Sequence, residues 1–169
     1  NICSDIVHIN GMAVPFGANI LFSIQGLPSA VIGVEVCEDL WIPLSPHEYQ
    51  ALAGANILFN ISASNEILAK ADWRRTMLSS ESGRCSAAFC FVSAGITESS
   101  NDFIFGGHAL IAEDATILEE SYGLTRDVKL IISDIDIDKL VHDRITLTSF
   151  RQNTDQLRAF RIIEAHITD

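Results

Sequence analysis

The run NILFNIS at residues 56–62 most constrains the fold, because it is almost wholly apolar and lies between two stretches with helical character. A short apolar run of this kind is typical of a strand that is buried on both faces of a sheet. The helical stretches are residues 47–55, with Gly54 near the end, and residues 67–85. Helices that alternate with strands indicate a layered α/β or α+β domain.

Further strands are predicted on both sides of this run. Segments 19–24 and 30–36 are separated by a turn with Gly26 and Pro28, so we expect two neighbouring strands. Three more regions carry strand patterns: 88–94, 103–121 as two strands joined at Glu113-Asp114-Ala115, and 128–137. The chain from about residue 140 is more polar and is expected to be peripheral, although residues 156–169 could continue as helix.

The helix predicted at 67–85 is amphipathic. One face holds the apolar residues Ile67, Ala71, Leu78 and Cys85. The charged residues Arg74, Arg75 and Glu81 are expected on other faces. The helix is therefore predicted to cover one face of the sheet.

Length and charge limit the classes of function. The chain has 169 residues, close to one domain, and 48% of them are apolar, which is ample for a core. It carries 11 Lys and Arg against 22 Asp and Glu, a formal net charge of −11, and no basic cluster beyond Arg74-Arg75. A phosphate backbone would be repelled, so nucleic acid is not an expected partner.

The sequence also bears on the compartment. No apolar run approaches the roughly 18 residues that span a bilayer, and residues 1–20 lack a secretory signal. The four cysteines show no Cys-x-x-Cys spacing, and Cys85 and Cys90 lie in apolar surroundings that suit reduced, packed thiols. We expect a cytoplasmic protein with no membrane partner.

Cys37 stands where the strand 30–36 stops and the motif VEVCEDLW turns polar. The carboxyl ends of strands are where open α/β sheets build ligand sites, so Cys37 is a candidate nucleophile at a sharp strand-to-helix turn. The alternative is a small buried residue, which is the commoner fate of cysteine. The acidic neighbours Glu35, Glu38 and Asp39 would raise the pKa of a thiol, so a nucleophilic Cys37 requires a cation from elsewhere in the fold.

Four motifs together resemble the nitrilase superfamily, and most closely the glutaminase domains of glutamine-dependent NAD synthetases. They are VEVCEDLW, LAGANILFNISAS, GRCSAAFCFVSAG and FGGHALIAEDATIL. The resemblance covers about residues 11–150. It implies an α-β-β-α sandwich, here an N-terminally incomplete portion, and a Glu-Lys-Cys triad whose cysteine attacks the side-chain amide of glutamine. The ammonia released would feed a synthetase domain.

The resemblance assigns roles to four positions. Cys37 matches the nucleophile and Glu38 a residue that faces the substrate pocket. Ser64 and Lys70 match positions that contact glutamine, although relatives commonly carry Arg in place of Lys70, and lysine lacks the planar fork that binds a carboxylate bidentately. From the residues alone, Ser64 is equally a helix N-cap and Lys70 a solvated charge.

The general-base glutamate and the catalytic lysine precede the cysteine in this family. Residues 1–36 contain no lysine and only one glutamate, Glu35. The resemblance therefore implies that both groups come from outside this chain, which would be inactive alone. His8, His47, His108 and His142 show no spacing typical of a metal site, so no metal is predicted.

Two classes of function stay open. The first is an amide hydrolase, either an NAD synthetase glutaminase or another nitrilase-type amidase. The second is a non-catalytic module that keeps the fold for assembly. The resemblance implies that 1–150 is the C-terminal part of a glutaminase domain, with 151–169 a peripheral tail or the start of a linker. It also implies glutamine as substrate, a homo-oligomer, and ATP and Mg only for a synthetase domain.

Overall fold

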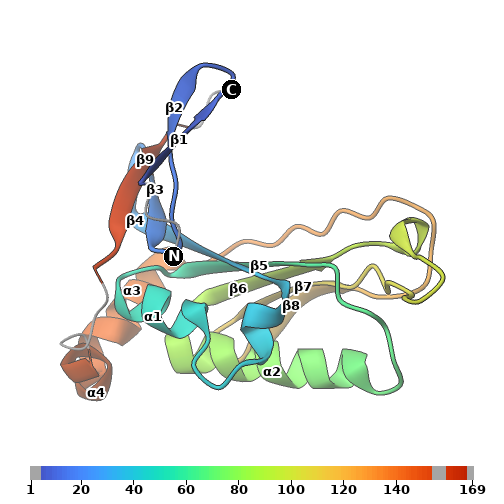
Figure 1. Ribbon diagram of the computed structural model, residues 1–169. Coiled ribbons are helices and arrows are strands. Elements are labelled where there is room, and N and C mark those ends of the chain that lie inside the picture. The colour runs from blue at the N-terminus through green and yellow to red at the C-terminus, as the bar shows by residue number, and fades with distance from the viewer. Residues whose placement is uncertain (1–4, 154–158, 167–169) are drawn as a thin grey trace.

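The computed structural model describes residues 5–153 and 159–166, and most of its strands form one mixed sheet (Figure 1). The strand order of this sheet is β8-β7-β6-β5-β4-β3-β9. Its strands are β3 (Ile20–Ile24), β4 (Leu27–Val36), β5 (Ile57–Ser62), β6 (Ala88–Ser93), β7 (Ala109–Glu113), β8 (Thr116–Ser121) and β9 (Arg161–Ala165). Strands β4, β5 and β6 are mutually parallel, and their neighbours β3 and β7 pair with them antiparallel. The predicted mixed α/β class is confirmed.

The helices connect and cover these strands. They are η1 (Cys37–Trp41), α1 (Pro46–Leu52), α2 (Lys70–Cys85), η2 (Ile96–Glu98), α3 (Ile137–Thr146) and α4 (Thr148–Gln152). The long helix α2 runs along one face of the sheet, against β6, β7 and β8 (Figure 1). Leu58, Phe89, Phe91, Leu110 and Ala112 are buried in the core that this arrangement creates.

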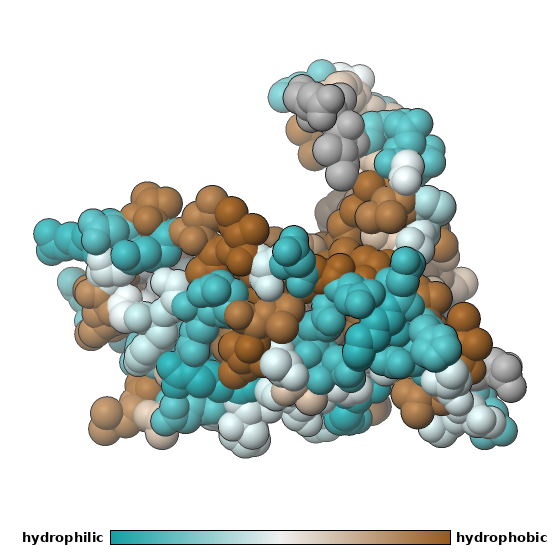
Figure 2. Space-filling view, turned by 180° about the vertical axis from the view of Figure 1, so that it is seen from behind, coloured by the Kyte–Doolittle hydropathy of each residue, from teal (hydrophilic) through white to brown (hydrophobic). Residues whose placement is uncertain are grey.

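A two-stranded hairpin projects from this body. Strands β1 (Ile6–Ile9) and β2 (Met12–Pro15) are joined by Asn10-Gly11, and both turn residues have positive φ, 51° and 80°. That is the backbone of the two-residue turn for which Asn-Gly is the preferred sequence. The hairpin stands away from the main sheet, and in the view from behind hydrophobic side chains gather in the hollow beside it (Figures 1 and 2).

The face of the sheet opposite α2 is only partly covered. On β5, Leu58, Asn60 and Ser62 are buried, whereas Ile61 is 53% exposed. The prediction that the run 56–62 is buried on both faces was therefore wrong for one face. The described residues form one helix-covered sheet, which is half of the expected α-β-β-α sandwich.

Residues 128–137, predicted as a strand, form no ladder in the structure. The segment runs in extended conformation past the open face of the sheet, and its end, Ile137, begins α3 (Figure 1). Val128 and Leu130 are 98% and 82% exposed. An alternating apolar pattern makes a strand only where a neighbouring strand has free hydrogen-bonding groups, and this segment lies over a face rather than along an edge.

The C-terminal region also differs from the expected helix. Residues 161–165 form β9, which pairs in parallel with the edge strand β3, so they extend the main sheet. Residues 154–158 and 167–169 lie outside the described residues. The run Arg161-Ile162-Ile163 is rich in β-branched residues, which suit a strand.

Helix α2 begins at Lys70, three residues later than predicted, so Ile67 precedes it and is exposed. Ala71, Leu78 and Cys85 are buried as expected. Arg74 was expected on another face, but it is fully buried, forms an ion pair with Glu66 and stacks over a core phenylalanine. Position 74 is three residues after Ala71 and four before Leu78, which places it on the buried face.

One arginine of α3 attaches that helix to the ends of α1 and α2. Arg144 donates hydrogen bonds to the carbonyl oxygens of Ala51, Ala55, Cys85 and Ser86 at distances of 2.7 to 3.4 Å. Carbonyl groups at helix C-termini lack partners within the helix, and a cation there also suits the helix dipole. Burial lowers the pKa of Arg144 to about 10, so the side chain stays charged at neutral pH.

We expect Arg144→Ala to lower the free energy of unfolding by about 2–4 kcal/mol, because several carbonyl groups lose a charged donor together. Urea denaturation followed by circular dichroism measures the change. Arg126→Ala is the matched control, since Arg126 is an exposed arginine, and it should change stability by less than about 0.5 kcal/mol. Equal stability of the two variants would contradict the role given to Arg144.

We also expect the chain to self-associate through its open face, because exposed apolar patches favour association. The triple variant Val128→Ser, Leu130→Ser, Ile132→Ser should shift sedimentation velocity profiles toward the monomer. Leu68→Ser removes a 99% exposed leucine outside this segment and should leave the profile unchanged. A compact wild-type monomer at high concentration would rule the association out.

Candidate functional site

The carboxyl ends of the three parallel strands meet at one edge of the sheet, and a cavity of about 460 Å³ lies there. We call it the Cys37 cavity. Its walls come from the segments that follow β4, β5 and β6: Cys37, Glu38 and Trp41, then Ala63, Ser64, Asn65 and Lys70, then Phe103 and Phe105. All four residues that the resemblance selected, Cys37, Glu38, Ser64 and Lys70, therefore line one cavity.

Cys37 occupies the sharp turn that the sequence predicted. It has a positive φ of 51°, which is uncommon for a residue with a side chain, and it begins the short helix η1 directly after β4. The Asp39 carboxylate accepts a hydrogen bond from the Val36 N–H at 3.0 Å and so fixes the entry to the turn. Residues held in such sparsely populated conformations cluster at functional sites.

A buried carboxylate lies next to this turn. Glu35 is 2% exposed, and it accepts hydrogen bonds from the His47 backbone N–H at 3.2 Å and from the Asn60 side chain at 2.9 Å. His47 Nδ1 lies 3.0 Å from the same carboxylate. The Asn60 side chain also donates to the Cys37 carbonyl at 3.3 Å. Asn60 thus ties the strained turn to the buried carboxylate.

His47 supplies the positive charge that Glu35 needs. Burial alone would lower the pKa of His47, but the hydrogen bonds and charges of Glu35 and Glu81 outweigh burial and raise it to about 9. His47 is therefore protonated at neutral pH. Glu35 is the one glutamate that precedes Cys37, and both of its oxygens are engaged by His47 and Asn60. It is not free to act as a general base.

Ser64 is not a helix cap. Helix α2 is preceded by Ala69 at the N-cap position, in the left-handed region, so that alternative was wrong. Ser64 is buried in the wall of the cavity, where its backbone N–H donates to Ser93 Oγ at 3.3 Å. Its role as a substrate contact stays a prediction.

Lys70 is half-buried rather than solvated. Its Nζ donates to Asn65 Oδ1 at 2.6 Å and lies 5.4 Å from the centre of the Trp41 ring. Burial and the nearby Arg74 lower the pKa of Lys70, while Glu66 and Cys37 act in the opposite direction. Lys70 is thus a cation that the fold brings to the cavity of Cys37, as a nucleophilic thiol in acidic surroundings requires.

Sequence reasoning missed several residues of this site. Trp41, Phe103 and Phe105 line the cavity, and Asn60 and His47 support the turn. Asn60 lies in the motif LAGANILFNISAS. The sequence of an apolar strand does not indicate which residue an asparagine within it will contact. The contact between His47 and Glu35 joins residues 12 positions apart and depends on how α1 packs against β4.

The family comparison covers most of the chain. A family model described as carbon-nitrogen hydrolase matches residues 10–144. The glutamine-dependent NAD(+) synthetase of Mycobacterium tuberculosis is 36% identical over 147 residues, which are 87% of this chain and 22% of that protein. The chain therefore spans about a fifth of the length of the curated relatives that it matches.

Solved structures agree with the fold. A glutamine-dependent NAD(+) synthetase from Cytophaga hutchinsonii superposes with a TM-score of 0.55 at 25% identity, over 68% of this chain and 17% of that one. Nit3 of Saccharomyces cerevisiae, a member of branch 10 of the nitrilase superfamily, gives a TM-score of 0.58 at 19% identity, over 73% of this chain and 44% of that one.

None of the helices in the described part of the chain has both the length and the apolar character that a membrane span requires.

The three described cysteines should differ in reactivity. Cys37 lines a cavity, whereas burial raises the pKa of the Cys90 thiol to about 11 and Cys85 is buried. At about pH 8 a thiol like Cys90 is ionised to only about one part in a thousand. In a Cys3→Ser background, iodoacetamide should therefore label Cys37 first.

Peptide mapping by mass spectrometry identifies the labelled residue. Cys37→Ala should remove the fast phase of labelling, and Cys90→Ser should leave it unchanged. Rapid labelling of Cys85 or Cys90 instead of Cys37 would favour the alternative, in which Cys37 is only a small packed residue.

Proposed function

Because the chain belongs to the carbon–nitrogen hydrolase family, we propose that it carries the nucleophile half of a glutaminase, in which Cys37 hydrolyses the side-chain amide of glutamine. The observation that supports this most is the position of Cys37, at a strained turn on the carboxyl edge of a parallel sheet and in one cavity with Lys70. Thioester chemistry needs a sulfur that the substrate can reach and a cation nearby, and these two cavity residues supply both.

The cavity suits a substrate with charges at one end and an amide at the other. In the proposal Lys70 binds the α-carboxylate of glutamine, and Glu38 faces the α-amino group. Ser64 contacts the substrate from the segment that follows β5. The aromatic residues Trp41, Phe103 and Phe105 pack against the methylene groups of glutamine. Because an ammonium group binds a carboxylate as a point charge, Lys70 should orient the substrate less strictly than arginine would.

The reaction proceeds in two halves. The Cys37 sulfur attacks the amide carbon as the thiol proton passes to a general base, and the tetrahedral adduct collapses when the departing nitrogen accepts a proton and leaves as ammonia. Water then attacks the thioester, which releases glutamate and restores the thiol. In the proposal a glutamate and a lysine outside this chain supply the general base and the second positive charge.

Asn60 positions the nucleophile in this scheme. Its amide contacts both the Cys37 carbonyl and the Glu35 carboxylate, so the turn is held from a buried part of the sheet. Rigid support of this kind matters, because small displacements of a reacting group cost much of the rate. Asn60 does not touch the reacting atoms and is a positioning residue.

The wider setting also belongs to the proposal. In the proposal residues 1–150 belong to the C-terminal part of the glutaminase domain, and 151–169 are a peripheral tail or the start of a linker, of which residues 161–165 join the main sheet as β9. Relatives of this chain are named glutamine-dependent NAD(+) synthetases. We therefore infer that the ammonia serves a synthetase domain that uses ATP and Mg, in a cytoplasmic homo-oligomer, while the glutaminase part needs no cofactor.

The test uses the whole protein that contains residues 1–169, with glutamine or ammonia as the nitrogen source. Cys37→Ala should abolish product formation from glutamine, by up to about a million-fold, and spare product formation from ammonia. Lys70→Ala should mainly raise KM for glutamine, because its charge pairs with the carboxylate equally in the ground and transition states. Lys129→Ala, an exposed lysine, is the control.

The outcomes separate the candidate functions. A Cys37→Ala protein that still uses glutamine would contradict the glutaminase. Loss of hydrolysis of another amide, with glutamine inert in the wild type, would indicate a different amidase of the family. No turnover of any amide by the whole protein would favour the assembly module. Residues 1–169 alone should release no ammonia from glutamine above the Cys37→Ala background.

A further inference from the structure

A second polar cluster lies between α1 and α2, apart from the Cys37 cavity. His47 comes from α1, and Glu81 and Cys85 lie one helical turn apart on α2. One ligand atom of each, the ring nitrogen, a carboxylate oxygen and the sulfur, lies within 4.8 Å of the other two. We propose that these three side chains bind a single divalent transition-metal ion of the zinc type.

The geometry of the pair His47 and Glu81 points to a metal. Nε2 of His47 is 3.5 Å from the Glu81 carboxylate oxygen. A charge-assisted hydrogen bond between such groups is usually about 2.7–2.9 Å long. In a tetrahedral zinc site with bonds of about 2.0 Å, neighbouring nitrogen and oxygen ligands are about 3.3 Å apart. The contact between His47 and Glu81 is therefore a long hydrogen bond, and its two atoms are already spaced nearly as two ligands of one zinc ion would be.

The surrounding groups orient these ligands as in a metal site. The other ring nitrogen of His47, Nδ1, is bonded to the buried Glu35 carboxylate at 3.0 Å, which directs Nε2 toward Glu81. Metal-binding histidines nearly always have such a carboxylate or carbonyl partner. Arg84 donates to both oxygens of Glu81 at 2.8 Å and holds that carboxylate in place.

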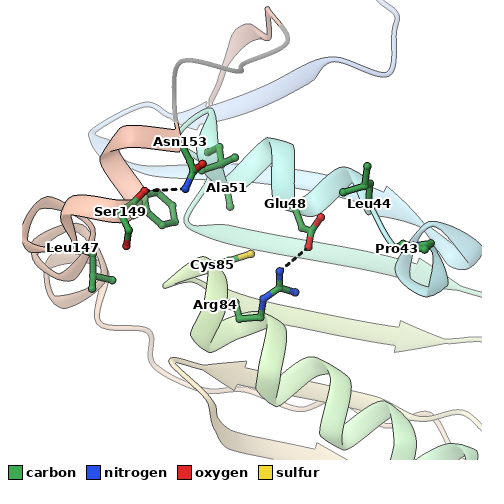
Figure 3. Close-up of a pocket in the computed structure, with 11 residues that line it drawn as sticks. Pro43, Leu44, Glu48, Ala51, Arg84, Cys85, Leu147, Ser149 and Asn153 are labelled. Carbon is green, nitrogen blue, oxygen red and sulfur yellow. Dashed lines mark hydrogen bonds and ion pairs between the residues drawn. The ribbon is translucent and has the colours of Figure 1, made fainter.

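The sulfur completes the set. Cys85 is buried, and no residue that the structure describes forms a hydrogen bond with its thiol. It also lines a cavity of about 420 Å³ between α1, α2 and α4, where Figure 3 shows its sulfur pointing into the space between α1 and α2, beside Arg84 and Glu48. His47 and Glu81 do not line this cavity, so Cys85 is the ligand that connects it to the proposed site.

The donor types decide which metal suits the site. One thiolate, one imidazole and one carboxylate in a tetrahedral arrangement favour zinc, whereas Mg²⁺ and Ca²⁺ require sets of oxygen ligands. As the metal binds, the Cys85 thiol and Nε2 of His47 give up their protons to solvent. The ion would then join α1 to α2 and hold the histidine that supports Glu35. This inference does not depend on the glutaminase proposal.

The test is a titration of the metal-free 169-residue chain with Co²⁺ and Zn²⁺, in a Cys3→Ser background. We expect one Co²⁺ per chain, an absorption band from thiolate-to-cobalt charge transfer, and displacement of Co²⁺ by Zn²⁺. Cys85→Ser should remove the band. Glu81→Gln, which keeps the size of the side chain, should lower the affinity for Co²⁺ by about tenfold or more. Mutating even the hydrogen-bond partners of metal ligands lowers metal affinity by at least about that factor.

Two controls separate this site from incidental binding. Cys37→Ser removes the other thiol near acidic residues, and Glu98→Gln alters an exposed glutamate, so both should bind Co²⁺ as the parent does. The proposal is overturned if no Co²⁺ binds at about 100 μM, or if the band is lost with Cys37→Ser and kept with Cys85→Ser. If Cys85→Ser does not fold, the comparison rests on the two glutamate variants. Equal affinities of Glu81→Gln and Glu98→Gln for Co²⁺ would then overturn the proposal.

Discussion

The buried carboxylate of Glu35 is the constraint on which the functional edge of this protein depends. Removing a carboxylate from water costs several kcal/mol unless charged and hydrogen-bonding partners replace the solvent. Here the partners are His47 from α1 and Asn60 from β5, and Asn60 is the residue paired with Glu35 in the parallel register. Satisfying this one charge therefore fixes the position of α1, the register of two central strands and, through Asn60, the turn at Cys37.

Much of the fold follows from local pattern. The runs at 19–24, 30–36, 56–62 and 88–94 form strands because β-branched and aromatic residues fill a pleated surface well, and Gly and Pro mark the turns between them. The same reasoning failed at 128–137. An alternating apolar pattern indicates which side chains share a face, but it does not indicate whether a neighbouring strand is available for pairing. It also failed at Arg74, whose charge suggested solvent although its position on the helix lies between Ala71 and Leu78.

The site was predictable only in part. Cys37 is marked by an apolar run that stops among acids, but the roles of Glu38, Ser64 and Lys70 came from resemblance, and the structure adds that they share a cavity. The aromatic wall could not be foreseen, because Phe103 and Phe105 follow a different strand. The contact between His47 and Glu35 depends on packing of two elements, and no spacing in the sequence encodes it.

Strand β9 has a consequence for the order of events during synthesis. Its pairing joins Ile20 to Arg161 and so closes a loop of about 140 residues. On a ribosome, β3 can pair with β4 as soon as both have emerged, but its other edge stays open until residues 161–165 follow. During that interval the edge offers unpaired backbone groups to any neighbouring nascent chain. Among the described strands, β3 is thus the one whose second edge waits longest for its partner, whereas the outer edge of β8 has no partner strand.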